Sequence, residues 1–346
     1  MQYSLCGVIK INNTNVIRNS AGKGIIRKKA KALLQSFLHI IPFFPLLAAP
    51  MLIIMSNTAA EAVSSALRVC VSTVIPSLFP FLVLSSYITA SGAADAIGKF
   101  LRKPFGAMFG ISGELASAFI VGLISGYPAG AMTAAELVRN KKCDSDSASR
   151  ALAFCSNTGP AFLIGGIGAG LLGDKRIGII LYIAEIISAV ICGVFMRKKD
   201  TVSENRCESS ITSDISYSSV FVRSVSSAAI SMLTICAFIV FFAVISEFLR
   251  LFLSQARNIP LTVQAVIVSA AEITAGIRCA SETGTVSAAL ISAFAVGWSG
   301  FSVLFQTSAV TEGCGMRMKY YISGKILQSF ICPAITFILV KITDII

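Results

Sequence analysis

Long apolar runs alternate with short polar connections along most of the chain. The runs lie at about 33–55, 69–90, 114–138, 151–174, 177–196, 220–249, 261–281, 285–310 and 326–340. About 20 apolar residues in a helix are enough to cross the hydrocarbon core of a bilayer. The pattern therefore predicts an all-α protein, a polytopic transmembrane helical bundle.

Two of these runs are interrupted by glycine and an aromatic residue. The interruptions are SGYPAG at 125–130 and GWSGF at 297–301. Each would stop a helix inside the membrane, where free backbone groups are tolerated only against protein or a wet cavity. Matched interruptions in two halves of a membrane protein point to a transporter's binding site. We therefore expect a broken helix or a re-entrant hairpin in each run.

The charges around the first interrupted run favour a hairpin. Basic residues lie on both sides of 114–138, at 99–103 and at 139–142, and basic residues mark the cytoplasmic side of a membrane. A segment that turns back near 126–130 satisfies both flanks. The run 285–310 is similarly followed by Arg317, Lys319 and Lys325. The side from which each hairpin enters is left open.

The runs divide the chain into two halves that resemble one another. We expect a basic, disordered cytoplasmic tail at 1–32, a first membrane half at 33–196, a polar linker at 197–219 and a second half at 220–346. Residues 117–131 align with 288–302 at a constant offset, which pairs the two interruptions, and Pro160 aligns approximately with Pro333. The alignment predicts an inverted repeat, with two unrelated glycine-rich helices as the alternative.

Composition and charge restrict the class of protein. Hydrophobic residues make up 55% of the chain and charged residues only 13%, which is typical of membrane proteins. The net charge of +12 is concentrated in the basic tail directly before an apolar run, which favours contact with lipid headgroups over nucleic acid. The ten cysteines form no CxxC pair and there is one histidine, so we expect neither a metal site nor a cofactor.

A polar stretch inside the fourth run is the first candidate for binding. Ser156, Asn157 and Thr158 precede Gly159 and Pro160, and proline disfavours helix at the residue before it. An opened helix there would offer free carbonyls, an amide and hydroxyls to a polar ligand. The alternative is an ordinary capped helix start.

Polar residues in other runs extend the candidate site. Gln306 and Ser302 are four apart and share a helix face. Glu136, Glu185 and Glu272 are carboxylates inside apolar runs, where each must pair, protonate or line water, so they are candidates for proton coupling or ligand contact. A solvated helix end for Glu136, and structural pairs for Glu185 and Glu272, are the alternatives.

Two aromatic residues complete the candidate site. Tyr127 and Trp298 could stack on a flat ring in the solute or could fill the gaps beside glycines. The candidate substrate-binding residues are Ser125, Gly126, Tyr127, Pro128, Gly130, Ser156, Asn157, Thr158, Gly297, Trp298, Ser299 and Gln306.

The sequences SGYPAGA, AFCSNTGPAFLIGGIG and GWSGFSVLFQ resemble the nucleoside-recognition, or Gate, family of bacterial membrane proteins, and within it a sporulation branch. The resemblance covers roughly residues 60–340. It implies two Gate repeats whose hairpins and unwound helices hold a ligand. For the sporulation branch it implies movement of dipicolinate into the forespore, in the mother-cell-derived outer forespore membrane. The family pattern has a second asparagine where this chain has Ser156, and Phe301 stands where the first repeat has Gly130.

We consider three functions for this sequence. A multi-pass cell-membrane transporter of a small polar or anionic solute, dipicolinate or nucleoside-like, is favoured over a structural or assembly protein of the spore membranes. An enzyme is disfavoured because there is no HExxH, no GxSxG and a single histidine. The expected partners are the solute and the lipid bilayer, without nucleic acid, and a homo-oligomer is left open.

Overall fold

The computed structural model describes residues 44–198, 217–256 and 258–345. The chain divides into two compact units, Met1–Ala59 and Ala60–Ile346. In the first unit, helix α2 spans Phe44–Ile54 and α3 begins at Ser56. The predicted tail, the start of the first apolar run and most of the linker lie outside the described residues.

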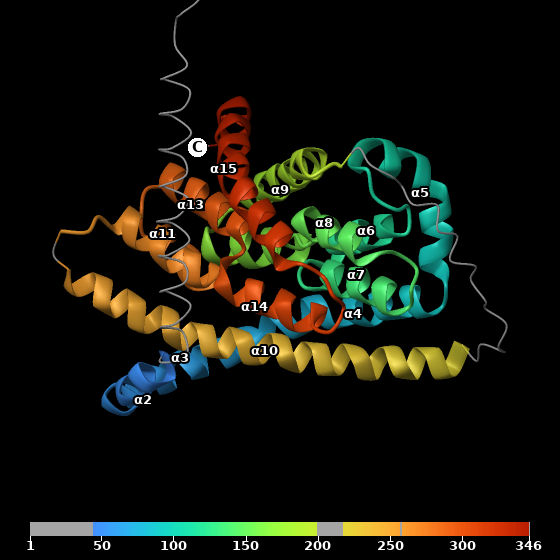
Figure 1. Ribbon diagram of the computed structural model, residues 1–346. Coiled ribbons are helices and arrows are strands. Elements are labelled where there is room, and N and C mark those ends of the chain that lie inside the picture. The colour runs from blue at the N-terminus through green and yellow to red at the C-terminus, as the bar shows by residue number, and fades with distance from the viewer. Residues whose placement is uncertain (1–43, 199–216, 257, 346) are drawn as a thin grey trace, which may run out of the picture. The chain divides into compact units, whose positions relative to one another are not determined.

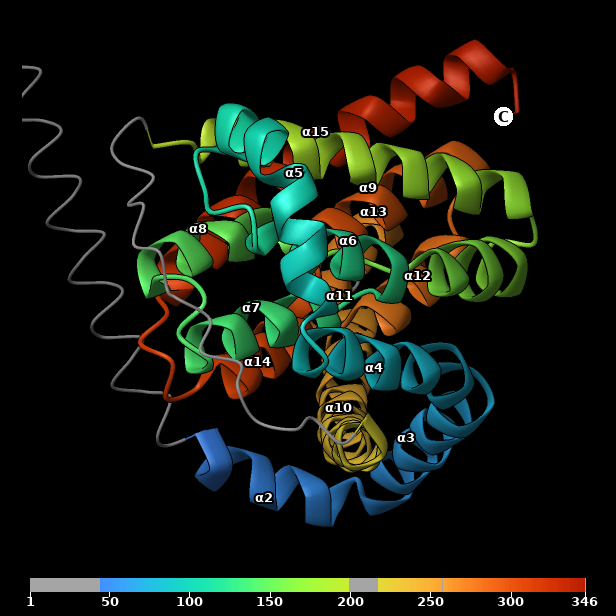
Figure 2. The same ribbon diagram turned by 90° about the vertical axis from the view of Figure 1, so that its right-hand side faces the viewer.

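The second unit is helical throughout its described part and contains no strand there (Figures 1 and 2). It contains α3 from Ala60 onward. The described elements are α3 (Ser56–Val69), η2 (Cys70–Val74), α4 (Ile75–Ala90), α5 (Ala93–Phe109), α6 (Leu115–Ser125), α7 (Ala129–Arg139), α8 (Ser145–Cys155), η3 (Ala161–Leu171), α9 (Lys175–Phe195), α10 (Tyr217–Gln255), α11 (Leu261–Ala271), α12 (Ile273–Ser281), α13 (Thr285–Trp298), α14 (Gly300–Thr311) and α15 (Met318–Thr343). Within the described ranges, four segments are long and apolar enough to cross a membrane: α9, α10, α13 with α14, and α15. The predicted all-α membrane fold is confirmed.

The first interrupted run forms the expected hairpin. Helices α6 and α7 pack against each other on either side of residues 126–128, and Gly126 at the tip has a φ of 87°. Gly122 and Gly130 let the two helices approach closely, because a Cβ on Gly130 would lie 2.9 Å from the Cα of Gly122. Glycine is therefore required in both the turn and the contact.

The polar stretch at 156–159 interrupts a second element, as Pro160 predicts. Helix α8 ends at Cys155, and the π-helical η3 begins only at Ala161. The side chain of Asp144 caps α8 by accepting from the Ser147 amide at 2.8 Å. Asp174 caps α9 by accepting from the Arg176 amide at 2.8 Å, and the Arg176 side chain also lowers the pKa of this exposed carboxyl. The element is therefore a broken helix: α8 and the following α9 have side-chain caps at their starts, whereas η3, which begins after the break, has none.

The second hairpin lies at Glu272, where the sequence pattern predicts a continuous run. Helices α11 and α12 fold back on each other, and a Cβ on Gly276 would meet the backbone of Ser269. Glu272 is extended, with φ −150° and ψ 132°, and its carboxylate accepts from the amides of Thr274 at 3.0 Å and Ala275 at 2.7 Å. The expected unbroken span at 261–281 is therefore wrong, because a side-chain cap replaces the glycine or proline that usually marks such a turn.

The run at 285–310 is a broken helix rather than a second hairpin. Ser299, at φ 68°, separates α13 from α14, and these two helices do not pack along each other. Helix α15 continues through Pro333 without a break. The sequence alignment therefore pairs Pro333, inside a continuous helix, with Pro160, at the end of an opened segment.

The same order of elements occurs twice in the second unit. A hairpin, a broken helix and a long helix follow each other as α6–α7, α8–η3 and α9, and again as α11–α12, α13–α14 and α15. In this order the tip at Gly126 corresponds to Glu272, and 156–159 corresponds to Ser299. The sequence alignment instead paired Gly126 with Gly297, and its register does not match the structure.

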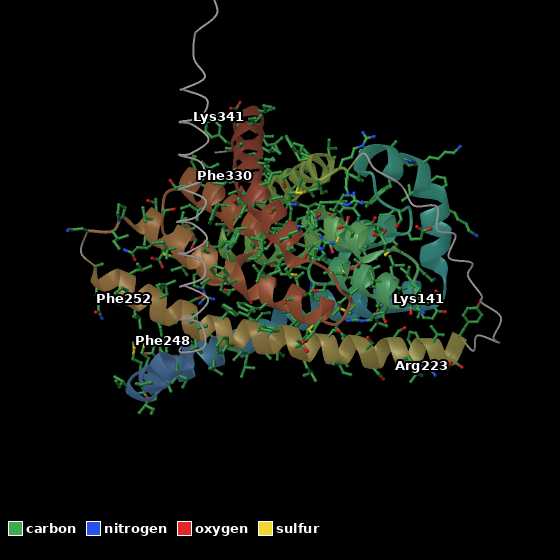
Figure 3. The ribbon with its side chains drawn as sticks, in the orientation of Figure 1. Lys141, Arg223, Phe248, Phe252, Phe330 and Lys341 are labelled. Carbon is green, nitrogen blue, oxygen red and sulfur yellow. The ribbon has the colours of Figure 1, made fainter. Side chains whose placement is uncertain are left out.

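One further feature differs from the sequence pattern, and another agrees with the membrane prediction. Residues 93–109, expected to be a polar connection, form helix α5. Outward-facing apolar side chains cover the long helices: Phe252 on α10 and Phe330 on α15, labelled in Figure 3, are 71% and 72% exposed. Such faces are unfavourable in water and suited to lipid.

Candidate functional site

Four interruptions of helix meet around one small cavity in the second unit. They are residues 126–128, residues 156–159 and Glu272, each of which contributes to its lining, and Ser299, which lies outside the lining but precedes the start of α14, where Ser302 and Val303 line the cavity. The cavity has a volume of about 40 Å³. We call it the central cavity, and its lining residues are Val69, Val74, Leu78, Gly126, Tyr127, Thr158, Gly159, Phe162, Ile235, Ile239, Glu272, Thr274, Ser302, Val303 and Gln306. Residues from both halves of the chain therefore contribute to one site.

A wider, more polar cleft adjoins the central cavity. This vestibule has a volume of about 590 Å³ and lies among α3, α10, α11 and α12. It shares Val69, Ile239, Glu272 and Thr274 with the central cavity. Arg250, paired with Glu247 at 2.5 Å, and the exposed Arg278 also line it. Glu272 thus stands at the boundary between a wide mouth and a narrow interior.

The helix starts around the central cavity favour negatively charged groups. A helix start presents free N–H groups and a positive partial charge. The start of α12 is occupied by the Glu272 carboxylate. The start of α14 has no side-chain cap, and Ser302 and Val303 in its first turn line the cavity. A donor-rich end therefore remains open to a solute.

The opened segment at 156–159 combines satisfied and unsatisfied polar groups. The Asn157 amide donates to the Phe154 carbonyl at 2.7 Å, and the Thr158 N–H donates to Glu185 Oε1 at 2.6 Å. Among the described residues, Ser156 Oγ, Asn157 Oδ1 and Thr158 Oγ1 are buried and have no partner. Because a carbonyl only accepts, the bond to Phe154 fixes which end of the Asn157 amide is the oxygen. Buried unpartnered atoms of this kind mark a place for water or ligand.

The second half contributes a matching amide. Gln306 is 2% exposed and its Nε2 donates to Ser302 Oγ at 3.1 Å, while its Oε1 has no partner in the described part of the chain. Gln306, Tyr127, Thr158, Gly126 and Glu272 are the sequence candidates that the structure brings together at the central cavity.

The other candidates lie outside the lining of this cavity. Gly130 packs against the Cys155 carbonyl, Gly297 faces the Gln328 carbonyl, and Ser299 Oγ donates to the Val296 carbonyl at 3.2 Å. Ser125 and Pro128 belong to the hairpin tip beside Gly126, and Ser156 and Asn157 lie directly before Thr158. Glu136 on α7 is not among the lining residues.

Trp298 is a structural residue in this arrangement. Its indole N–H donates to the Ala270 carbonyl at 3.0 Å, and its ring meets Phe301 edge to face. The bond satisfies a carbonyl near the end of α11, beside the second hairpin tip. The stacking role proposed for the two aromatic residues therefore remains open only for Tyr127.

We expect Trp298→Phe to weaken the fold and leave solute recognition intact. Losing one hydrogen bond to a half-buried carbonyl costs about 1 kcal/mol, which lowers the melting temperature by a few degrees. The KM for solute should stay within about twofold, because a structural bond contributes stability rather than recognition. A melting curve and an uptake assay on the same preparation measure both. A KM that rises tenfold with unchanged melting would instead assign the ring to the solute.

A buried polar group on α15 is not evident from the sequence pattern. Lys325, which the pattern places in a basic flank, is 1% exposed and donates to Gln328 Oε1 at 2.9 Å. Gln328 in turn donates to the Ala153 carbonyl at 3.0 Å. Gly324, whose Cβ would lie 2.5 Å from the same carbonyl, allows this close packing. Gly324, directly before Lys325, is the sequence feature that indicates close helix packing at this position.

Comparisons with known proteins agree with this architecture. Residues 71–196 match the Gate family model, described as nucleoside recognition. The chain is 25% identical over 317 residues to the sporulation integral membrane protein YlbJ of Bacillus subtilis strain 168, covering 81% of this chain and 77% of that protein. No solved structure matches. The part that matches the Gate model includes the first hairpin and the first broken helix, whereas GWSGF at 297–301 lies outside it. The predicted resemblance is thus confirmed: the first half of the chain is similar to the Gate family model, and most of the chain is similar to an integral membrane protein of sporulation.

Proposed function

We propose that this chain is a membrane transporter of a small polar or anionic solute rather than an enzyme or an assembly protein. The observation that carries the proposal is the convergence of four interruptions on the central cavity. Unwound backbone is costly in hydrocarbon and is tolerated where it lines a cavity. Carrier proteins use such discontinuous helices from two repeats to bind solute near the middle of the membrane.

The two cavities support a pathway for the solute. A vestibule of about 590 Å³ leads to a central cavity of about 40 Å³, and both are bounded by Glu272 and Thr274. The central cavity has room for a few water molecules at most. Binding of an aromatic solute therefore requires the walls to separate, and the hairpin α11–α12, which contributes to both cavities, is the element that we expect to move.

We propose dipicolinate, entering the forespore across its outer membrane, as the first candidate solute. The similarity to a sporulation membrane protein supports this setting. A dicarboxylate suits the uncapped start of α14, and its ring suits Tyr127 at the first hairpin tip. An inverted relation between the two halves would place these groups on opposite sides of one solute.

A nucleoside is the second candidate, and specific atoms favour it. The unpartnered Gln306 Oε1 is an acceptor in the lining of the central cavity, which suits the N–H and O–H donors of a nucleoside. The description of the matching family as nucleoside recognition points the same way. The two candidates differ in charge, so one assay separates them.

Uptake into liposomes containing the purified protein tests the proposal. We expect accumulation of labelled dipicolinate, competed by unlabelled dipicolinate and not by uridine; the reverse competition would favour the nucleoside. Gln306→Leu replaces a buried amide with an apolar side chain of similar size, and it should lower uptake about tenfold or more. Gln255→Leu, the same change at an exposed position on α10, is the matched control. Folded protein that moves neither solute would overturn the proposal in favour of an assembly role.

A further inference from the structure

The lysine on α15 is buried next to the broken helix of the first half. Lys325 is 1% exposed, and its ammonium donates a hydrogen bond to Gln328 Oε1 at 2.9 Å. In the described part of the chain it makes no ion pair within 4.0 Å. A buried ammonium is costly unless an opposite charge compensates it.

Glu185 on α9 is the carboxylate that can provide this compensation. It is 1% exposed and lies on α9, which packs along α15, the helix that carries Lys325. Glu185 Oε1 accepts from Thr158, and its Oε2 has no partner among the described residues. The two groups are therefore opposite charges buried on neighbouring helices, with no ion pair within 4.0 Å between them.

Both ends of the opened segment are attached to this pair of helices. On one side, Gln328 Nε2 donates to the Ala153 carbonyl, where α8 loses its helical partners. On the other side, Glu185 accepts from Thr158, which lines the central cavity. The geometry of the opened segment thus depends on a buried network of Glu185, Lys325 and Gln328.

The remaining titratable groups near the pair do not supply a second charge. They are phenols and thiols, which are ordinarily uncharged near neutral pH. The groups that interact electrostatically with Glu185 or Lys325 are Tyr127 at the first hairpin tip, Tyr182 on α9, Cys155 on α8, Cys192 on α9 and Cys332 on α15. Lys325 is therefore the cation on which Glu185 relies.

We propose that Lys325 is a built-in counter-cation, a positioning residue that holds Glu185 and the opened segment in the form that binds solute. Unwound carbonyls and carboxylates in carriers commonly hold a sodium ion. Here a tethered ammonium provides the positive charge, so the carrier requires no sodium. This inference rests on the transport function proposed above, but it makes a separate prediction about cation binding.

Removing the ammonium should create a requirement for a free cation. Wild-type uptake should be equal, within about twofold, in sodium and in choline buffer, because an ammonium already compensates the carboxylate. Lys325→Met should lower uptake in choline more than about tenfold, since an unpaired buried charge is strongly destabilising. Sodium should restore uptake of this variant at least about threefold by binding beside Glu185. Lys341→Met, an exposed lysine on the same helix (Figure 3), should behave as the wild type in both buffers.

A double variant and a melting assay separate this inference from the transport proposal. Lys325→Met with Glu185→Gln removes both charges and should fold without responding to sodium. Melting in detergent should show sodium stabilising Lys325→Met but neither the wild type nor the double variant, even if no uptake is found. Sodium-dependent wild-type uptake or melting, or a Lys325→Met variant indifferent to sodium, would overturn the inference. A double variant that fails to fold would do the same.

Discussion

Replacing Gly130 by valine is expected to leave little or no folded protein. A Cβ at this position would overlap the Cys155 carbonyl oxygen, and it would lie 3.0 Å from the Ala118 carbonyl. These are backbone atoms of α6 and α8, so no side chain can rotate away to make room. Overpacking that displaces backbone costs several kcal/mol, and the larger cases exceed about 4–5 kcal/mol. The first hairpin would lose its contact with the broken helix.

The measurement is the yield of monodisperse protein by size-exclusion chromatography after extraction in mild detergent. Gly165→Val is the matched control: it makes the same change in η3, where a Cβ at Gly165 meets nothing within 4 Å. We expect the control to resemble the wild type and Gly130→Val to aggregate. A Gly130→Val protein that elutes and melts like the wild type would show that the two helices do not approach as closely as described.

Glu272→Ala is expected to reduce uptake more than tenfold while the protein still folds. The substitution removes both hydrogen bonds to the start of α12, and loss of an N-cap costs about 0.5–2 kcal/mol. That cost is local, at the tip of the second hairpin. Because Glu272 also bounds the vestibule and the central cavity, a frayed tip disturbs the solute pathway at its narrowest part.

Glu282→Ala provides the control for this effect. Glu282 follows the last turn of the same helix, lines the vestibule and is exposed. It should leave uptake within about twofold, since an exposed carboxylate outside the cap contributes little. Equal losses of uptake in the two variants would attribute the result to vestibule charge and contradict a special role for the hairpin tip.

The sequence predicts the elements that carry glycine or proline signals. The first hairpin follows from SGYPAG and its basic flanks, and the opening at 156–159 follows from Pro160. The candidates Tyr127, Thr158 and Gln306 were found because polar or aromatic residues are unusual in apolar runs. All three line the central cavity.

Features that depend on tertiary contacts could not be predicted in this way. The turn at Glu272 has no glycine or proline beside it and is made by a side-chain cap inside an apolar run. Lys325 lies near other basic residues in sequence, and only the packing of α15 against α8 and α9 shows that it is buried. Helix α15 passes through Pro333, which neighbouring helices make tolerable in a membrane protein. The register of the repeat depends on these same features.

The two hairpin tips and the two broken helices should together enclose a single bound solute. A cryo-electron microscopy structure of the protein saturated with the solute that it accumulates tests this directly. We expect density in contact with Tyr127, Thr158 and Gln306, with the α11–α12 hairpin displaced to enlarge the central cavity. Density located elsewhere, with the interruptions packed as they are here, would contradict it.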